Sequence, residues 1–424
     1  MSKMKLYTVF VLFVWSFLSQ ANTLVKADAM LDVNNGKLIK NPLLVIQDGK
    51  IAAIENHKKY VVADGDTLID LSGHTIMPGL MDMHVHLTSD ATQHGYRRLT
   101  SSLPRVTLTG VKHAEQTLMA GFTTVRNVGA PGFADVALKD AINDGDLVGP
   151  RMFVAGRSIG VTGGHCDNNF LPFEYKAKSG GVADGPWEVR AKVRENIKYG
   201  ATVIKFCATG GVLSKGTKVG VQQYTFDEMS ALIEEAHMRG LTVAAHAHGL
   251  EGINTAIRAG VDSVEHVSFV DDETIKLAKK MGTYFSMDIY VTEYILGEGE
   301  KAGILEESLN KERKVGSIQR ENFRKAVKAG VNMVFGSDAG VYPHGDNPKQ
   351  FSRMVQFGMT PLQAIQAATI NSASLLKQNE VLGSLEEGKI ADIIAVKGNP
   401  LDDISVLESV SFVMKEGRVF KQLN

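Results

Sequence analysis

The residues best suited to chemistry in this chain are histidines, a lysine and an aspartate that lie in or directly after short apolar runs. His84 and His86 form a His-x-His pair in the run 76–87. Side chains two residues apart on a strand face the same side, so both imidazoles can bind one metal ion. Four further runs carry or precede a residue of comparable potential: Lys205, His246, His266 and Asp338.

Taken singly, these residues have ordinary structural explanations. A lone histidine in a strand is more often structural than a ligand. Lys205 lies inside an apolar run and, if buried, must be paired, neutralised or modified. Asp338 follows Gly336 and Ser337, a position that also suits a turn or helix cap. If the five runs are strands of one barrel, however, all these residues meet at its catalytic end, which predicts a metal centre.

Eight apolar runs alternate with helix-like segments along most of the chain. Two of these segments, 227–240 and 320–330, end in glycine, the usual stop signal of a helix. The alternation predicts a (β/α)8 TIM barrel over residues 76–375. An open doubly wound sheet is disfavoured because no G-x-G-x-x-G follows a strand, and 211–218 lacks the Lys-Ser/Thr of a phosphate loop. The eight runs are 76–87, 122–128, 151–156, 203–208, 242–247, 263–269, 283–289 and 332–337.

Both ends of the chain have the pattern of short strands separated by turns. Residues 43–55 are typical of a hairpin whose turn is Asp48-Gly49. Two strand-like segments, 391–400 and 411–420, lie near the C-terminus. We therefore expect residues 22–75 and 376–424 to form one small β-sandwich module beside the barrel.

Composition excludes several classes of protein. The chain has 424 residues, a net charge of −1 and 44% hydrophobic residues, which excludes a disordered chain. A balanced charge argues against nucleic-acid binding, because phosphates require a positive surface. Two cysteines exclude a disulfide scaffold, and whether Cys166 and Cys207 pair stays open.

The N-terminus has the pattern of a secretory signal peptide. Lys3 and Lys5 precede the apolar run 6–18, and Ala21 offers a small residue for cleavage. A membrane anchor is the alternative, but this run is shorter than the about 20 residues that span a bilayer. We therefore predict that residues 1–21 are removed and that the protein is exported to the periplasm or secreted, with no stable membrane anchor.

The order His-x-His, Lys, His, His, Asp resembles that of the amidohydrolase superfamily, in its binuclear-metal type. Several stretches are similar to an exported group of Xaa-Lys/Arg carboxypeptidases and prolidases (Xaa-Pro dipeptidases) that is related to imidazolonepropionase. These stretches are GFTTVRNVG (121–129), TGGHCD (162–167), VIKFCATGGV (203–212), VAAHAHG (243–249) and GSDAGVYPHGDN (336–347). The resemblance covers the whole chain after the predicted signal peptide.

The resemblance implies two divalent metal ions. The ligands of the more buried ion would be His84, His86 and Asp338. The ligands of the more exposed ion would be His246 and His266. Lys205, carboxylated at Nζ by CO2, would bridge both ions with its two oxygens. Zn2+ suits this set of ligands, and Mn2+, Co2+ and Fe2+ stay as alternatives.

The resemblance also implies a mechanism. A hydroxide shared by the two metal ions would attack an amide carbonyl, with Asp338 as general base and then general acid. His248 lies two residues after His246, and His165 lies in a glycine-rich loop after the third strand. Either histidine is a candidate to donate a hydrogen bond to the oxyanion or to a substrate carboxylate.

Three further residues are candidates for binding the substrate. By analogy with related prolidases, Tyr224 would bind the terminal carboxylate. Asp288 and Glu293 follow the seventh strand and are candidates to pair with a basic side chain of the substrate. Acidic residues at a surface are usually only solvated, which is the simpler explanation for these two.

Together these features predict a metal-dependent hydrolase, a carboxypeptidase or dipeptidase, that releases a C-terminal Lys or Arg and, second, Pro. An ochratoxin-type hydrolase of N-acyl amino acids stays open as the alternative. A deaminase or cyclic-amide hydrolase generally lacks the bridging lysine, so Lys205 argues against it. A non-catalytic metal-binding barrel is disfavoured by the complete set of ligands. The partner would be a small peptide or N-acyl amino acid, and a homo-oligomer stays open.

Overall fold

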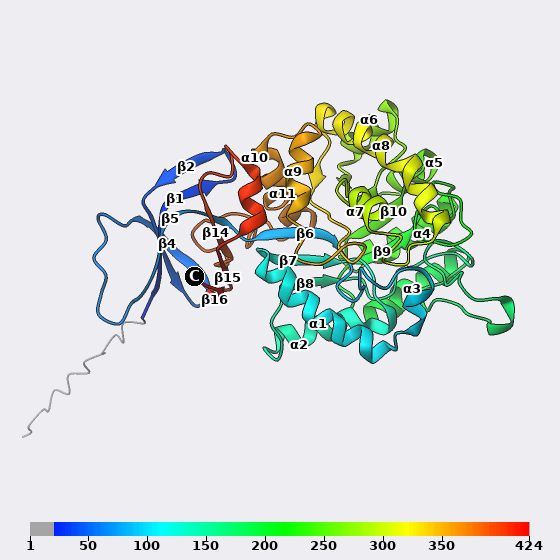
Figure 1. Cartoon of the computed structure of the whole chain (residues 1–424), viewed down its shortest axis with the longest axis horizontal. Helices are drawn as coiled ribbons and strands as arrows, with labels where there is room; N and C mark the ends of the chain where they lie inside the picture. The colour runs from blue at the N-terminus through cyan, green and yellow to red at the C-terminus, as the bar shows by residue number, and fades with distance from the viewer. Residues whose placement is uncertain (1–20, 424) are drawn as a thin grey trace, which may run out of the picture.

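A computed structural model describes residues 21–423 of the chain. Nearly all of the predicted signal peptide therefore lies outside the described residues. Figure 1 shows a module of strands at one end of the molecule and a larger barrel surrounded by helices at the other. In the described part of the chain, no helix is long and apolar enough to cross a membrane.

The barrel strands lie within the eight predicted runs. They are β6 (Leu80–Val85), β7 (Phe122–Asn127), β8 (Arg151–Val154), β9 (Ile204–Cys207), β10 (Val243–Ala247), β11 (Ser263–His266), β12 (Tyr284–Ser286) and β13 (Met333–Val334). All are parallel to their neighbours, in the orders β6-β7-β8 and β9-β10-β11-β12-β13. Parallel bridges between Ile159 and Phe206 and between Val85 and Ala339 join the two groups. The predicted TIM barrel is thus confirmed.

Helices cover the outside of the barrel and alternate with its strands (Figure 1). They are α1 (Leu103–Met119), α2 (Ala134–Asn143), α3 (Pro186–Lys198), α4 (Phe226–His237), α5 (Leu250–Arg258), α6 (Asp272–Met281), α7 (Val291–Gly297), α8 (Glu306–Ala329), α9 (Lys349–Gln356), α10 (Pro361–Ala367) and α11 (Ile370–Leu375). Local signals fix their ends. Thr225 and Glu228 form a capping box at the start of α4, and Gly330 ends α8 with φ of 70°.

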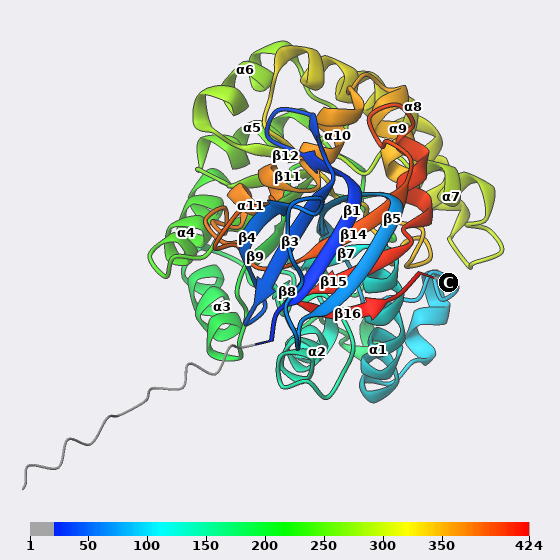
Figure 2. The ribbon, with the colours of Figure 1, turned by 90° about the vertical axis from the view of Figure 1, so that its left-hand side faces the viewer.

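The module contains strands from both ends of the chain, as predicted. Its strands are β1 (Thr23–Asp32), β2 (Lys37–Lys40), β3 (Pro42–Gln47), β4 (Lys50–Asn56), β5 (Thr67–Pro78), β14 (Ile393–Lys397), β15 (Phe412–Lys415) and β16 (Arg418–Lys421). The order is β16-β15-β14-β5-β1-β3-β4, with β2 on β1, so these strands form one continuous mixed sheet. Figure 2 shows this sheet in front of the barrel. Asp48 and Gly49 have φ of 47° and 74°, as the predicted hairpin turn requires.

Candidate metal centre

The predicted metal ligands meet in one cavity of about 840 Å³ at the carboxyl ends of the barrel strands. β6 carries His84, β9 carries Lys205, β10 carries His246 and β11 ends at His266. His86 is the first residue after β6, and Asp338 lies in the loop after β13. Because parallel strands of a barrel present their carboxyl ends on one face, residues far apart in the chain converge there. All six line the cavity.

Their ligand atoms form overlapping clusters. The Nε2 atoms of His84 and His86 lie 3.3 and 3.5 Å from Oδ1 of Asp338. In each of three groups the candidate ligand atoms lie within 4.8 Å of one another. The groups are His84–His86–Asp338, His246–His248–His266 and His266–Asp288–Asp338. His266 and Asp338 link these groups into one continuous site with room for more than one cation.

The second nitrogen of several of these imidazoles is already held by the protein. The Nδ1 atom of His86 lies 3.2 Å from the Gly129 carbonyl oxygen, and that of His266 lies 2.9 Å from Oδ1 of Asp288. Such contacts fix the ring orientation and leave Nε2 as the free ligand atom, as is usual for metal-binding histidines. Nε2 of His246 is buried without a hydrogen-bond partner. Coordination to a metal ion would satisfy this buried nitrogen.

A buried ion pair supports His84 from behind. Nδ1 of His84 lies 3.1 Å from Oε2 of Glu265, and Arg126 donates to the other oxygen of Glu265 at 2.7 Å. Arg126 and Glu265 are fully buried. The guanidinium compensates the buried carboxylate, so the carboxylate can stay charged beside the imidazole.

The electrostatics of the site favour a cation beside neutral imidazoles. Burial and Lys205 disfavour protonation of His84. Its contacts with Asp338 and Glu265 nevertheless raise its pKa to about 9. Burial, together with the neighbouring histidines and Lys205, lowers the pKa of His246 well below its usual value. Burial opposes ionisation of Asp338, but His84 and His86 hold the pKa of this carboxyl below its usual range. A divalent cation could therefore replace the proton on His84 and bind neutral imidazole nitrogens.

Lys205 lies on the fully buried strand β9, in the same cavity. Burial lowers its pKa to about 8, against the opposing charges of Glu265 and Asp338. A lysine with a lowered pKa has a larger fraction of neutral amine, the form that reacts with CO2. The histidines and Asp338 therefore fit divalent cations, and Lys205 lies in the same cavity.

Backbone strain also marks the site. His266 and Asp338 have φ of 72° and 58°, in the left-handed region that non-glycine residues rarely adopt. The surrounding structure must hold them there: the Asp338 N–H donates to the His84 carbonyl at 2.8 Å, and Gln319 donates to the His266 carbonyl at 3.0 Å. Strain of this kind commonly occurs at functional sites.

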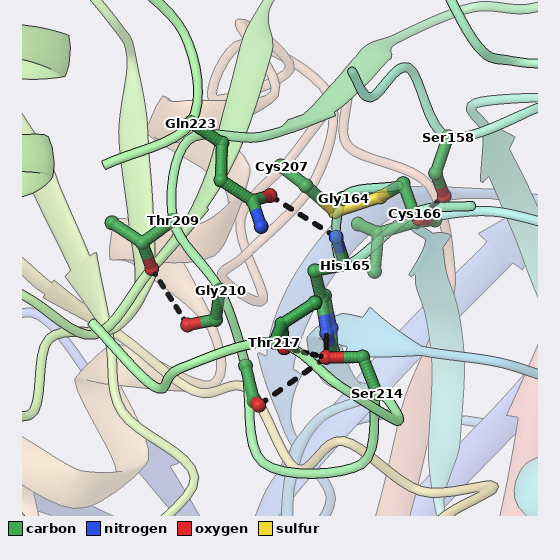
Figure 3. Close-up of a disulfide and its surroundings, with 12 residues drawn as sticks. Ser158, Gly164, His165, Cys166, Cys207, Thr209, Gly210, Ser214, Thr217 and Gln223 are labelled. Atoms are coloured by element: carbon green, nitrogen blue, oxygen red, sulfur yellow. Dashed lines mark hydrogen bonds between the residues drawn. A yellow bond between two sulfur atoms is a disulfide. The ribbon is translucent and has the colours of Figure 1, made fainter. Parts of the chain in front are cut away.

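His165 and His248, the predicted hydrogen-bond donors, lie in the cavity. The His165 ring stacks on that of His246 with centroids 3.9 Å apart, and its Nδ1 lies 2.8 Å from Oγ of Ser214. Figure 3 shows this contact beside a disulfide between Cys166 and Cys207. The pairing that the sequence left open is thus present next to the site.

Of the three residues predicted to bind the substrate, Asp288 lines the cavity, whereas Tyr224 and Glu293 do not. Tyr224 is 1% exposed, does not line the cavity and donates its hydroxyl to the Ala183 carbonyl at 2.7 Å. Glu293 also lies outside the cavity lining, where it pairs with Arg353. Asp288 lines the cavity, and its Oδ1 accepts hydrogen bonds from His266 at 2.9 Å and from Gln319 at 3.0 Å, so this oxygen already orients an imidazole. The substrate-binding roles expected for Tyr224 and Glu293 therefore do not fit their contacts, and that of Asp288 stays a prediction.

Two other charged residues line the cavity and are in positions to bind a substrate. Glu312, on α8, is 3% exposed, lines the cavity and accepts a hydrogen bond from the Thr292 hydroxyl at 2.6 Å. Arg98 lies at the rim of the cavity, its guanidinium 4.9 Å from the centre of the Phe170 ring. Among the described residues neither forms an ion pair. No local pattern distinguished them, because each lies among other charged residues in the sequence.

Comparison with known proteins agrees with this geometry. The amidohydrolase family matches residues 75–420. A solved structure described as a Xaa-Pro dipeptidase with methionine in the active site is 40% identical, with a TM-score of 0.89 over 95% of this chain and 100% of that one. A prolidase complexed with N-methylphosphonate-L-proline is 30% identical, with a TM-score of 0.87 over 95% and 100%. Ochratoxinase of Aspergillus niger is 35% identical, covering 92% of this chain and 85% of its own.

The barrel, the cluster of histidines and carboxylates and these similarities define a class of enzyme. The chain belongs to the amidohydrolase family. It is a hydrolase that acts on carbon–nitrogen bonds.

Proposed function

We propose that the protein is a metal-dependent carboxypeptidase or dipeptidase that releases a C-terminal amino acid, Lys or Arg first and Pro second. The observation that carries the proposal is the charge arrangement of one cavity. A cluster of histidines and carboxylates lies at its floor, with Arg98 at the rim and Glu312 in the wall. A dipeptide with a basic C-terminal residue is complementary to all three.

The metal site is proposed as two divalent cations, with Zn2+ favoured by the set of donors. His84, His86 and Asp338 would hold one, His246 and His266 the other, and Nζ-carboxylated Lys205 would bridge them. Bound there, the cations would lower the pKa of a water molecule and polarise the carbonyl of the substrate.

The residues of the chain would carry the proton and orient the substrate. Asp338 is ionised, so it can accept a proton from the attacking water and deliver it to the leaving amine. Burial lowers the pKa of His165 to about 3, and that of His248 falls well below its usual value. Both rings are therefore neutral, and each can donate one hydrogen bond to the developing oxyanion or to the substrate carboxylate.

The side chain of the released residue would meet Glu312. Burial raises the pKa of this carboxyl to about 7. Arg320, a cation whose charge acts on it, is itself paired with Glu293 at 3.3 Å. A buried carboxylate with no cation of its own gains strongly from an incoming ammonium or guanidinium. The substrate carboxylate would bind Arg98, for which a bidentate contact is the favoured geometry.

An ochratoxin-type hydrolase of N-acyl amino acids is the second candidate. The similarity to ochratoxinase of Aspergillus niger favours it. Both candidates share the attack on an amide bond to a free amino acid, and they differ in the side chain of the released residue. A neutral aromatic side chain would offer Glu312 no positive charge, which favours the peptidase proposal.

A panel of synthetic amides tests the proposal. The zinc-loaded protein without residues 1–21 is assayed on Ala-Arg, Ala-Lys, Ala-Pro and N-acetyl-phenylalanine, and on the C-terminal amide of Ala-Arg. We expect the free acid Ala-Arg to be cleaved faster than its amide by roughly two to four orders of magnitude in kcat/KM, because the amide leaves buried polar groups unpaired. Equal rates on acid and amide would contradict a carboxypeptidase. Faster release of phenylalanine than of arginine would favour the ochratoxin-type alternative.

A further inference from the structure

The disulfide between Cys166 and Cys207 joins two parts of the candidate site. The two cysteines are 41 residues apart, with Cα atoms separated by 6.0 Å. Cys207 is the last residue of β9, two positions after Lys205. Cys166 directly follows His165 in the loop between β8 and α3. Both cysteines line the cavity, so the bridge lies at the site itself.

The hydrogen bonds of His165 are made to another loop. Its backbone N–H donates to Oε1 of Gln223 at 3.1 Å, and its Nδ1 lies 2.8 Å from Oγ of Ser214 (Figure 3). Gln223 and Ser214 both lie in the segment between β9 and α4. The disulfide instead attaches the His165 loop to a strand of the barrel. It is the more rigid of these attachments, because β9 is buried and paired on its side toward β10.

The backbone around the disulfide allows the two cysteines to approach each other. A Cβ atom at Gly160 would lie 2.6 Å from the Cβ atom of Cys166, so only glycine allows this approach. The Ile159 N–H donates to the Lys205 carbonyl at 2.9 Å, and the Cys207 N–H donates to the Ile159 carbonyl at 2.9 Å. The start of the loop is therefore paired with β9 beside the cysteine that the bridge reaches.

The position of His165 matters for the site because its ring stacks on a candidate metal ligand. The ring centroids of His165 and His246 are 3.9 Å apart, with an interplanar angle of 17°. A loop that moved by an ångström would carry this ring away from His246 and from the position in which it could contact a substrate. Errors of that size in positioning commonly cost about a hundredfold in rate.

We propose that the Cys166–Cys207 disulfide is a positioning device that holds His165 against His246, so that full turnover requires the oxidised protein. Reduction would free the loop and lower kcat/KM, while the barrel stays folded and the metal ions stay bound. The inference rests on the proposed hydrolytic site. It adds a dependence on redox state that the metal ligands alone do not require.

The reductant in the test is a trialkylphosphine, which does not offer a thiol to the metal ions. It attacks one sulfur and releases the other as thiolate; water then displaces the second sulfur. Two thiols and one phosphine oxide result, and the oxygen comes from water. The half-buried Cys166 lines the cavity and is the sulfur that the reagent can approach. Thiol titration should rise from none to two per chain.

The first measurement needs no substrate. Hydrogen–deuterium exchange of the zinc-loaded protein is followed with and without phosphine, together with metal content. We expect faster exchange in residues 160–170 only, with both metal ions retained. The Cys166→Ser/Cys207→Ser double variant is the matched control: it should exchange like the reduced protein and should not respond to phosphine. Unchanged exchange after both thiols are titrated, or loss of metal, would overturn the proposal.

The second measurement separates positioning from general destabilisation. On whichever panel substrate the oxidised protein cleaves, reduction should lower kcat/KM by about tenfold or more, and reoxidation should restore it. In His165→Gln, which has already lost the ring, reduction should change kcat/KM by less than about twofold. Two changes that act through the same side chain are not additive. An equal loss in both backgrounds would show that the bridge does not act through His165. A parent protein that is inactive on the whole panel would refute the proposed function. The hydrogen–deuterium exchange measurement would then still test whether the disulfide holds the His165 loop.

Discussion

At the scale of single residues, each of several cavity histidines is oriented by a partner at its second ring nitrogen. His266 is held by Asp288, His248 by Ser268 and His84 by Glu265. Each of these partners is buried. Asp288 illustrates the consequence: Oδ1 of its carboxylate accepts from His266 and Gln319, so this oxygen orients an imidazole although the residue lines the cavity. A residue of the right type in the right cavity therefore serves catalysis only through the contacts it has left free.

Lys205→Ala tests the proposed bridge. Without the lysine no carboxylate can bridge the two cations, so we expect loss of most activity and of at least one metal ion per chain. Metal content by mass spectrometry and kcat/KM on Ala-Arg are the measurements. Short carboxylic acids such as acetate should partly restore both by filling the gap. Lys215→Ala, at the same cavity but outside the metal cluster, is the control and should keep its metal ions. A Lys205→Ala protein that is active with two metal ions and no added acid would rule out the bridge.

Glu312→Gln tests recognition of a basic side chain. The parent should prefer Ala-Arg over the neutral isostere Ala-citrulline by at least about tenfold, since a hydrogen bond to a charged group contributes about 1.5–3 kcal/mol. The variant should lose that preference. With a pKa of about 7, Glu312 is protonated below pH 7 and charged above it, so the preference should increase from pH 6 to pH 8.

The control for this comparison is Glu321→Gln, because Glu321 is an exposed acidic residue of the same helix, α8, and lies outside the cavity lining. It should leave the ratio of the two rates unchanged. If the ratio of the rates on Ala-Arg and Ala-citrulline were equal in the parent and in Glu312→Gln, Glu312 would not recognise the substrate, whatever the absolute activity.

At the scale of elements, buried polar contacts join strand β6 to the segment that follows β13. Asp82, on β6, accepts from the side chain of Asn347 at 2.8 Å and from the backbone N–H of Ser337 at 3.1 Å. Asp82 is fully buried, which raises its pKa to about 6. These contacts join β6 to the loop that carries Asp338. The relative position of two predicted ligand segments therefore depends on a residue that is itself no ligand.

Gly211→Ala tests the close packing of the loop after β9. A Cβ atom at Gly211 would lie 2.7 Å from Nε2 of His246 and closer still to the His165 ring. Overpacking of this kind costs about 1–3 kcal/mol and displaces the rings that it meets. We expect kcat/KM to fall by at least about tenfold and zinc affinity to decrease in a competition titration. Gly297→Ala, where a Cβ meets nothing within 4 Å, should behave like the parent. Activity of Gly211→Ala within twofold of the parent would contradict this packing argument.

At the scale of the whole molecule, both chain ends are needed to complete one sheet. β14 pairs antiparallel with β5, and β5 pairs parallel with β1, so the C-terminal strands join the N-terminal ones directly. Figure 2 shows these strands side by side. β1 begins at Thr23, two residues after Ala21, where cleavage is predicted. Removal of residues 1–21 would therefore leave the sheet intact.

We propose that the protein is exported, and N-terminal sequencing tests this. A disulfide such as Cys166–Cys207 persists mainly in oxidising compartments, which supports the proposal. The mature protein recovered from the exporting host should begin close to Asn22. Val11→Asp interrupts the apolar run, so this variant should stay in the cytoplasm with Met1 retained. A parent protein that also begins at Met1 would disprove cleavage. The boundaries predicted for the domains remain predictions as well.

The sequence alone determined the barrel, the module from both chain ends and the order of candidate ligands. These follow from local patterns: apolar runs of strand length, glycine stops, and polar residues at run ends, where the barrel rule brings them together. Only the tertiary structure decided which side chains face the cavity. Glu293 and Glu312 are both acidic residues in helical segments, and the packing of α7 and α8 over the strand ends places only one of them in the cavity. Tyr224 is buried away from the cavity, and Cys166 meets Cys207, for the same reason: such contacts depend on how distant segments pack, which no local pattern encodes.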